Sequence, residues 1–340
     1  MKIFYYFIIL CCGLFSGCAI ENDFNLMVNK VELNYAGYND KVTYTTKRKL
    51  RLLTNELSNK FYKAESFDNR TRILKNWLAF FRDYHLQISS ASTTATSFGK
   101  KSKPPELTIL DTETVLIRVF SFNLYYKSAL DKLLSENQKI ILSNKTLIID
   151  LRGNSGGGDS AYSELLPFLY TNPIKTKGVD FWASEDNINL FHKMLAVTEI
   201  PTNVKSQIKN LLTQMEKNTN SFVTWLGEIE KFEEVYKNPE RVAILIDGKC
   251  ASAAEQFLLA AKQSKKVILF GSNTRGCLDY SNINFITLPS GKRSIGIPTS
   301  RSRRLPENPI DFTGIPPDIK LPEDLENKTD YIRKYIKADN

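Results

Sequence analysis

One stretch, residues 241–255, limits the possible folds of this chain more than any other. It reads RVAILIDGKCASAAE. The run VAILID has the length and the branched composition of a buried strand. Gly248 and Lys249 then turn the chain, and the sequence from Ser252 onward predicts a helix. Ser252 is therefore expected where a strand ends and a helix begins, and backbone N–H groups at such a position favour negative charge.

Two interpretations of Ser252 stay open from this stretch alone. Ser252 and Glu255 have the spacing of a capping box, in which the serine caps the helix and the glutamate reaches back. The arrangement strand–turn–serine–helix is also a common way to present a nucleophile. The remainder of the chain has to distinguish a cap from a nucleophile.

Strands and helices alternate from Leu107 onward, and this alternation predicts an α/β core. The stretch TLIIDL, residues 146–151, is apolar throughout, which indicates a strand covered on both faces. A glycine-rich run, residues 152–158, follows it. Glycines there allow unusual turns and close approach by a ligand, and their N–H groups can supply half of an oxyanion hole. A tight turn with no ligand is the alternative, and the run lacks the patterns of nucleotide-binding loops.

The expected organisation follows from composition and periodicity. Its segments are a signal peptide (1–17), a tether with an N-terminal helical region (18–88), a polar loop (89–105), a core (106–322) with a helical insertion at about 185–238, and a C-terminal helix (323–340). In the helical region, apolar residues of the segment 69–84 fall on one helix face. His85 directly follows this segment.

The first 17 residues have the charged start, apolar middle and small-residue end of a secretory signal. Their apolar run is too short to span a membrane as a stable helix. Ser16 and Gly17 before Cys18 resemble a bacterial lipobox, so we expect lipidation at Cys18 and an anchor on the extracytoplasmic side of a membrane, in the periplasm or at the outer membrane. An ordinary signal peptide cut nearby is the alternative.

Composition argues against several kinds of site. The net charge of +9 is spread along the chain apart from clusters at 47–51 and 301–304, so we expect solvated faces and no nucleic-acid site. No Cys and His set has metal-ligand spacing, and we expect neither a metal nor another cofactor. Export would permit a bridge between Cys250 and Cys277, but two free thiols is the favoured interpretation.

Four motifs in order resemble the tail-specific, or C-terminal processing, family of serine peptidases. They are the strand and glycine turn LIIDLRGNSGGG, the nucleophile segment ASAAE, the Thr-x-Gly turn at 274–276 and the closing GIPPDI. The resemblance covers about residues 70–322. It implies an α/β fold with a crotonase/Clp-protease-like core and an N-terminal helical subdomain. It also implies a serine peptidase that acts on peptide or protein substrates.

The resemblance further implies how Ser252 is activated. One branch of the family places a base lysine directly after the Thr-x-Gly turn, but Cys277 occupies that position here. The other branch, similar to the core of tricorn protease, uses a histidine in an Asp-x-His segment, and Asp83-Tyr84-His85 matches it. Ser252 is thus the implied nucleophile and His85 the implied base. His192, the only other histidine, is expected on a helix surface.

The remaining site residues are implied in the same way. Asp311, three residues before the closing motif, matches the acidic residue that orients the histidine, and Glu307 is the alternative. The oxyanion is expected to bind the backbone N–H of Ala253 and that of Gly156 or Gly157.

One departure from the family and two other functions complete the expectations. Only about 20 residues separate His85 from the first core strand, too few for the PDZ domain of tail-specific members, so capture of a substrate tail by strand addition is not expected. An inactive module of this fold, binding a peptide or an apolar ligand, is the alternative function. A structural surface lipoprotein is a third. Retention of both Ser252 and His85 favours the enzyme.

Overall fold

The computed structural model describes residues 22–91, 102–196 and 202–338 of the 340-residue chain. The expected signal peptide, Cys18 and most of the expected polar loop lie outside the described residues. The chain divides into two compact units, and each is built from three separate segments. Unit 1 comprises residues up to 94, 179–225 and 280–303, and unit 2 comprises residues 95–178, 226–279 and 304–340.

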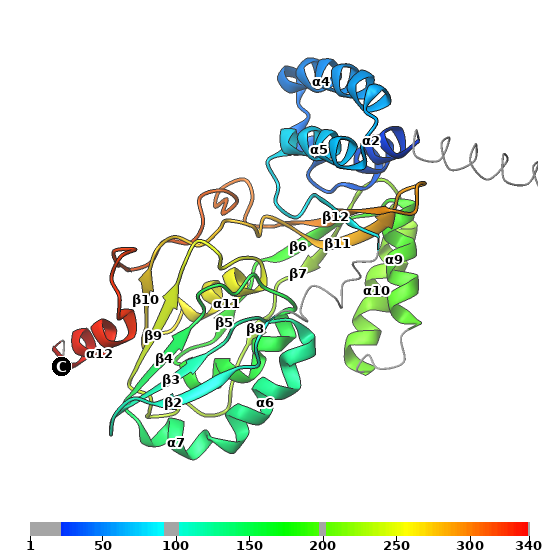
Figure 1. The fold of residues 1–340 in the computed structure, drawn as a ribbon. Coiled ribbons are helices and arrows are strands. Elements are labelled where there is room, and N and C mark those ends of the chain that lie inside the picture. Colours follow the sequence, from blue (N-terminus) through cyan, green and yellow to red (C-terminus); the bar gives the residue numbers. More distant parts are fainter. Residues whose placement is uncertain (1–21, 92–101, 197–201, 339–340) are drawn as a thin grey trace, which may run out of the picture. The chain divides into compact units, whose positions relative to one another are not determined.

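Unit 2 is built on a six-stranded sheet with the strand order β13-β10-β9-β4-β3-β2 (Figure 1). Its strands are β2 (Glu106–Ile109), β3 (Thr114–Arg118), β4 (Thr146–Asp150), β9 (Arg241–Ile246), β10 (Val267–Gly271) and β13 (Ile319–Lys320). Neighbouring strands are parallel except for β2 and β3, which are antiparallel. The apolar runs TLIIDL and VAILID form β4 and β9 at the centre of the sheet, which confirms the expected α/β core.

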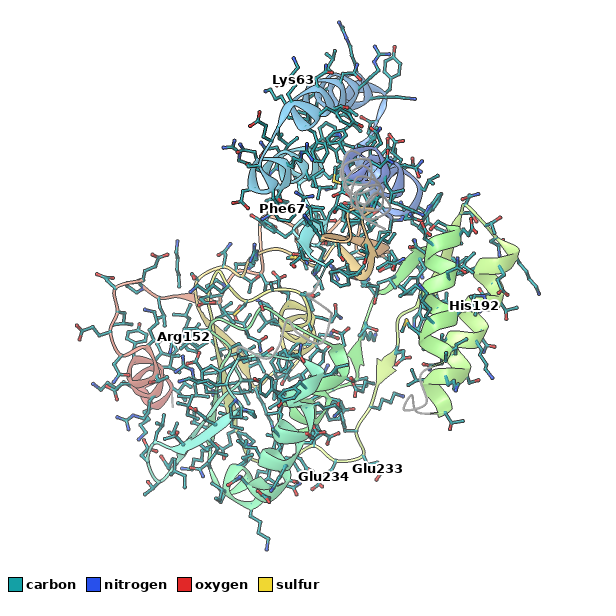
Figure 2. All side chains as sticks on the ribbon, turned by 45° about the vertical axis from the view of Figure 1, so that its right-hand side comes forward. Lys63, Phe67, Arg152, His192, Glu233 and Glu234 are labelled. Atoms are coloured by element: carbon teal, nitrogen blue, oxygen red, sulfur yellow. The ribbon has the colours of Figure 1, made fainter. Side chains whose placement is uncertain are left out.

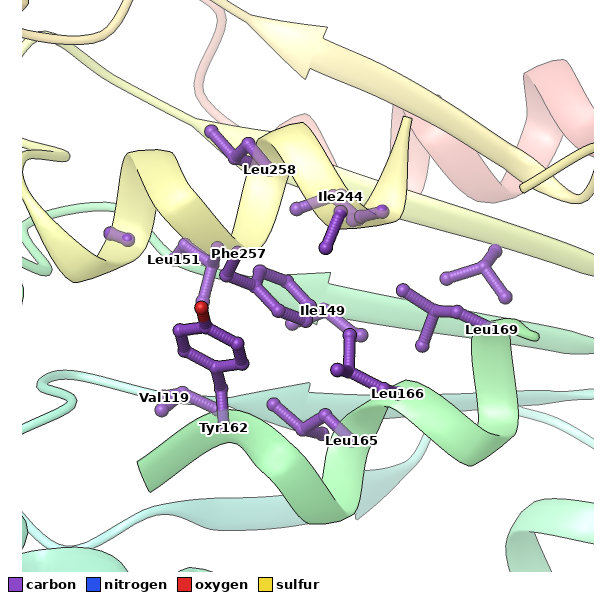
Figure 3. Packing of buried hydrophobic residues seen from close by; sticks show 14 of the residues in the cluster. Val119, Ile149, Leu151, Tyr162, Leu165, Leu166, Leu169, Ile244, Phe257 and Leu258 are labelled. Atoms are coloured by element: carbon purple, nitrogen blue, oxygen red, sulfur yellow. The ribbon is translucent and has the colours of Figure 1, made fainter. Parts of the chain in front are cut away.

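Both faces of this sheet are covered, and this explains why its central strands are apolar at every position. Ile149 and Ile244 point into a large hydrophobic cluster that also contains Phe257 (Figure 3). Ile148 and Leu245 point the other way, into a smaller cluster. The helices of unit 2 are α6 (Lys127–Glu136), α7 (Gln138–Ser143), α8 (Leu166–Leu169), α11 (Ala253–Ala261) and α12 (Lys328–Ala338), with short 3-10 helices at Leu124–Tyr126 and Asp159–Leu165.

Unit 1 combines a second sheet with helices. Its strands are β1 (Gln87–Ser90), β6 (Gly178–Trp182), β7 (Phe222–Leu226), β11 (Tyr280–Thr287) and β12 (Arg293–Ser302). The long strand β12 pairs antiparallel with β1, β6 and β11, so it is the centre of this sheet. The helices are α2 (Asp23–Asn34), α3 (Tyr38–Lys41), α4 (Tyr44–Lys63), α5 (Phe67–Leu78), α9 (Glu185–Leu195) and α10 (Thr202–Lys217).

Two segments differ in detail from their sequence pattern. The segment 185–238 contains α9 and α10, but also β7 and the short strand β8 (Ile229–Glu230), which pairs with β5 (Ile174–Lys175). The helix expected over 69–84 ends at Leu78 and continues as one 3-10 turn. Arg82, with φ +47°, ends that turn, because the left-handed region cannot continue a right-handed helix. The chain is thereby redirected towards His85.

A buried ion pair fastens the first described helix to the central strand of unit 1. Arg293 Nη1 lies 2.9 Å from Asp23 Oδ2, and the two side chains are 1% and 0% exposed. Ser290 donates its N–H and its hydroxyl to the Asp23 carboxylate. The other guanidinium nitrogens donate to the Thr71 hydroxyl and to the Phe67 carbonyl. Both buried charges are therefore paired and hydrogen-bonded, the condition for burying an ion pair at modest cost.

Candidate active site

Ser252 has a strained backbone at the N-terminus of α11. Its φ and ψ are +56° and −122°, a combination uncommon for any residue other than glycine. Such a residue costs on the order of 1–3 kcal/mol and persists only where its surroundings hold it. The preceding strand, β9, ends at Ile246, and Ser252 itself is partly exposed. This is the geometry of a serine presented on a sharp strand-to-helix turn.

Glu255 holds the segment around Ser252 from inside the unit. Its fully buried carboxylate accepts the Ser252 N–H at 3.0 Å, and both halves of the expected capping box are present. The same carboxylate accepts the N–H groups of Gly276 and Cys277 and the hydroxyl of Thr274 at 2.6–2.9 Å. Glu255 therefore ties the nucleophile segment to the Thr-x-Gly turn, which goes beyond capping.

The glycine turn lies directly against this segment. Gly156 has φ +97°, and a Cβ there would meet the carbonyl oxygen of Ala251 at 2.6 Å and the Cβ of Ser252 at 2.8 Å. Only glycine allows that approach. The Gly156 N–H donates to the side-chain oxygen of buried Asn154, whose own carbonyl accepts the Ala251 N–H. Asn154 thus joins the glycine turn to the residues before Ser252.

The backbone N–H groups of Gly157 and Ala253 are potential hydrogen-bond donors beside Ser252. Phe122 N–H donates to the Gly156 carbonyl, and the Phe122 carbonyl accepts from Gly158, so Gly157 lies between these bonds and takes no part in them. Within the described residues, no protein acceptor is bonded to the N–H of Gly157 or to that of Ala253. Ala253 is the first residue of α11, where N–H groups lack partners inside the helix.

His85 lies in unit 1 and is 8% exposed. Its Nδ1 is 2.6 Å from the carbonyl oxygen of Tyr280, and its backbone N–H donates to Asp83 Oδ1. A carbonyl acceptor at Nδ1 favours the neutral tautomer that keeps a lone pair on Nε2. Asp83 also accepts the Tyr35 hydroxyl at 2.7 Å. Burial raises the pKa of the Asp83 carboxyl, and the nearby His85 and Tyr35 act in the opposite direction.

The two acidic candidates lie in unit 2 in different surroundings. Asp311 Oδ1 accepts the N–H groups of Leu278 and Asp279 at 2.8 and 2.9 Å. The Asp279 carboxylate accepts the Asp311 N–H in return. Glu307 is exposed. Asp311 is therefore the more firmly held carboxylate of the two.

Unit 2 thus brings together Ser252, the glycine turn and the Ala253 N–H, while His85 belongs to unit 1. Sequence reasoning missed Asn154 and Thr274 as supporting residues. The only signal for Asn154 was its place as a polar residue in the glycine-rich run that follows a buried strand, where side chains commonly approach a site.

The other sequence-based candidates have ordinary structural roles. His192 is exposed on α9 and pairs with Glu216 at 3.0 Å (Figure 2). Cys250 and Cys277 are buried and are not joined by a disulfide, and burial raises the pKa of the Cys250 thiol. Among the described residues, no group of three or more metal-binding side chains is present, and no helix is long and apolar enough to cross a membrane.

Several solved structures have a similar fold over almost the whole length of this chain. The structure resembles mature CPAF complexed with lactacystin (12% identity, 95% of this chain and 98% of that chain, TM-score 0.66). It also resembles a putative peptidase from Parabacteroides merdae (15% identity, 94% of this chain and 96% of that chain, TM-score 0.59). A third similar structure is a lipoprotein from Streptococcus agalactiae (18% identity, 95% of this chain and 97% of that chain, TM-score 0.57). At these identities the likeness concerns the fold alone.

Sequence comparison identifies the family. A search of curated protein sequences gave no match. The family model described as peptidase family S41 matches residues 113–321, more than half of the chain. The match includes the glycine turn, Ser252 and the closing motif, and the fold agrees with it. The chain therefore belongs to peptidase family S41, the family of the tail-specific serine peptidases.

Proposed function

We propose that this protein hydrolyses peptide bonds with Ser252 as the nucleophile and His85 as the general base. Family membership supports a peptide or protein as the substrate. The observation that carries the assignment of Ser252 is its backbone, with φ +56° at the start of α11. An ordinary helix cap has extended backbone, so capping alone leaves this strain unexplained.

In the proposed reaction, Ser252 Oγ attacks the substrate carbonyl and passes its proton to His85 Nε2, which then protonates the leaving amine. Water next attacks the acyl-enzyme, gives a proton to His85, and releases the acid product as Ser252 regains its proton. The carbonyl of Tyr280 supports this role, because it favours a lone pair on Nε2. Tyr280 lies three residues after Cys277, whose carbonyl accepts the Ser252 N–H.

We assign the oxyanion to the N–H groups of Ala253 and Gly157. Both are uncommitted within the described part of the chain, and the N-terminal position of Ala253 on α11 adds the favourable end of the helix dipole. The Gly156 N–H is engaged by Asn154, so the proposed part of Gly156 is steric. It allows the backbone to lie against Ser252.

Asp311 is the proposed acidic residue of the site. Because Nδ1 of His85 already faces the Tyr280 carbonyl and Nε2 takes the proton of Ser252, the proposed part of Asp311 is to stabilise the charged form of His85 by its negative charge. The two backbone N–H groups at its Oδ1 support this choice over exposed Glu307, because a fixed carboxylate loses less freedom when it stabilises a partner.

We also propose that the protein is exported and lipid-anchored through Cys18. The signal pattern supports this, as does the likeness in fold to a bacterial lipoprotein. Metabolic labelling of cells with radioactive palmitate tests it, and the label is expected to disappear in Cys18→Ala. Label retained in that variant would contradict the assignment.

The catalytic proposal is tested with a fluorophosphonate probe, which reacts with activated serines. Wild-type protein is expected to be labelled, and Ser252→Ala is not. His85→Asn should slow labelling by at least about 100-fold, because a general base typically contributes that much or more. His192→Asn is the matched control, since it alters the only other histidine.

Three results would refute these roles. Labelling that persists in Ser252→Ala would place the nucleophile elsewhere. Equal effects of the two histidine variants would remove His85 as the base. Absence of labelling in folded wild-type protein would favour the inactive, ligand-binding module.

A further inference from the structure

Helix α4 of unit 1 has an unusual concentration of positive charge. Six of its 20 residues are Lys or Arg, and Glu56 is its only acidic residue. Leu50, Leu57 and Phe61 are buried and hold one face of the helix against the unit. Because these three positions form one stripe, Arg48, Arg51 and Lys63 are left on the opposite, solvent-facing side.

The outward side of α4 mixes cations with exposed apolar groups. Tyr44 is 99% exposed and Leu52 is 56% exposed, and both lie at helical spacing with exposed Arg48. Arg51 and Lys63 are exposed on the same side, and no ion pair engages them within the described residues. Cations interleaved with Tyr and Leu on one helix side are typical of helices that lie on lipid headgroups.

The first described helix of unit 1, α2, follows the predicted lipid anchor closely in the sequence. Helix α2 begins at Asp23, five residues after Cys18 in the sequence. An extended chain spans at most about 3.5 Å per residue, so the tether reaches roughly 17 Å. Phe24 of α2 packs on Phe61 with ring centroids 5.7 Å apart, which fixes the last turn of α4, the end that carries Lys63, beside the start of α2. Figure 1 shows the two helices next to each other. Arg293 holds Asp23 in place.

We propose that the outward side of α4 docks on the surface of an anionic lipid bilayer. Charge complementarity, the exposed Tyr44 and Leu52, and the short tether from Cys18 all point to this partner. A soluble acidic protein or a nucleic acid would account for the positive charge of α4, but not for the exposed Tyr44 and Leu52 or for the short tether. The acyl chains supply the attachment, and α4 sets the orientation of unit 1 on the membrane. This inference rests on the proposed lipid anchor at Cys18 and does not depend on the catalytic role of Ser252.

The test uses the mature chain, residues 18–340, with Cys18→Ser so that no acyl chain contributes. Co-sedimentation is measured with vesicles of phosphatidylcholine alone or with about 30% phosphatidylglycerol, at low and at high salt. Binding is expected only to the anionic vesicles and only at low salt, because salt screens exposed charges. The variant Arg48→Glu, Arg51→Glu, Lys63→Glu should bind at least about 100-fold more weakly, since each basic residue at such a surface contributes about fivefold.

The matched control is Lys139→Glu, Lys209→Glu, Lys265→Glu. It makes the same change in net charge at exposed positions outside α4, and should bind within about threefold of wild type. If the α4 variant loses its helical circular dichroism, the milder triple change to Gln replaces it, with an expected loss of about 100-fold.

Equal binding to neutral vesicles, equal losses in both triple variants, or no binding at low salt would each overturn the proposal. Fluorophosphonate labelling in solution should be the same in the α4 variant as in wild type. This readout separates a failure of the docking proposal from a failure of the catalytic one.

Discussion

The carboxylate of Glu255 accepts the backbone N–H of Ser252 at 3.0 Å from a fully buried position. Three further donors, from Thr274, Gly276 and Cys277, complete its hydrogen bonding. A buried charge is tolerated only when its hydrogen bonds are satisfied, so the four donors and the carboxylate depend on one another. The strained conformation of Ser252 is held by this arrangement.

Glu255→Ala is expected to destabilise the protein by about 3–5 kcal/mol, because it leaves several buried donors unpaired. Urea unfolding measures the loss. Exposed Glu164 provides the control, and Glu164→Ala should change stability by about 0.5 kcal/mol or less. Equal effects of the two variants would show that the carboxylate of Glu255 does not hold the nucleophile segment.

Ser252→Gly is expected to be more stable than Ser252→Ala by about 1 kcal/mol. Glycine adopts positive φ without steric cost, whereas alanine keeps the strain of the native serine. Neither variant should react with a fluorophosphonate. Thermal unfolding of the pair gives the comparison, and a more stable alanine variant would contradict strain at this position.

The sequence was most informative where local pattern and tertiary structure agree. TLIIDL and VAILID are apolar at every position because their sheet is covered on both faces, so strand and environment could be predicted together. The junction at Ser252 followed from strand and helix periodicity. The hydrogen bonds from Thr274, Gly276 and Cys277 to Glu255 could not be predicted in this way, since these donors lie 19–22 residues further along the chain. The two discontinuous units likewise depend on pairings between distant segments.

Gly157→Ala should disrupt the glycine turn and abolish fluorophosphonate labelling. A Cβ at this position would lie 2.1 Å from the Phe122 carbonyl oxygen, so the backbone must move. Gly153→Ala is the matched change, because its φ is +81° but no heavy atom lies within 4 Å of the added carbon. It should cost only about 1 kcal/mol of backbone strain and retain labelling. Comparable losses in both would point to backbone strain, not close contact, as the cause.

Asp23→Ala is expected to destabilise the protein by about 3–5 kcal/mol, because it leaves the Arg293 guanidinium buried without its partner. The double variant Asp23→Ala, Arg293→Met should recover part of this loss, since it removes the unpaired charge as well. A double-mutant cycle in urea measures the coupling. Additive effects would contradict a direct interaction between the two side chains.

The Asp111 carboxyl should contribute to stability in a pH-dependent way. Desolvation acts to raise its pKa, but hydrogen bonds from Lys337 and from the Glu113 N–H outweigh it and lower the pKa to about 2. A lowered pKa in the folded state stabilises the protein above the unfolded value, and the contribution is lost as pH falls through about 2. Asp111→Asn should therefore lower the urea midpoint at pH 7 but not near pH 2.

Exposed Asp324 makes the control for that experiment, and Asp324→Asn should leave the midpoint unchanged at both pH values. A deficit of Asp111→Asn that persists undiminished near pH 2 would show that ionisation of the carboxyl is not its source.

The central strand of unit 1, β12, ends at Ser302, whereas the helices it supports begin at Asp23. A nascent chain therefore lacks the middle of this sheet until residues 293–302 have been made. Unit 2 likewise waits for β13 and α12. Neither sheet can be completed early during synthesis, so each unit depends on segments of the chain that are made late.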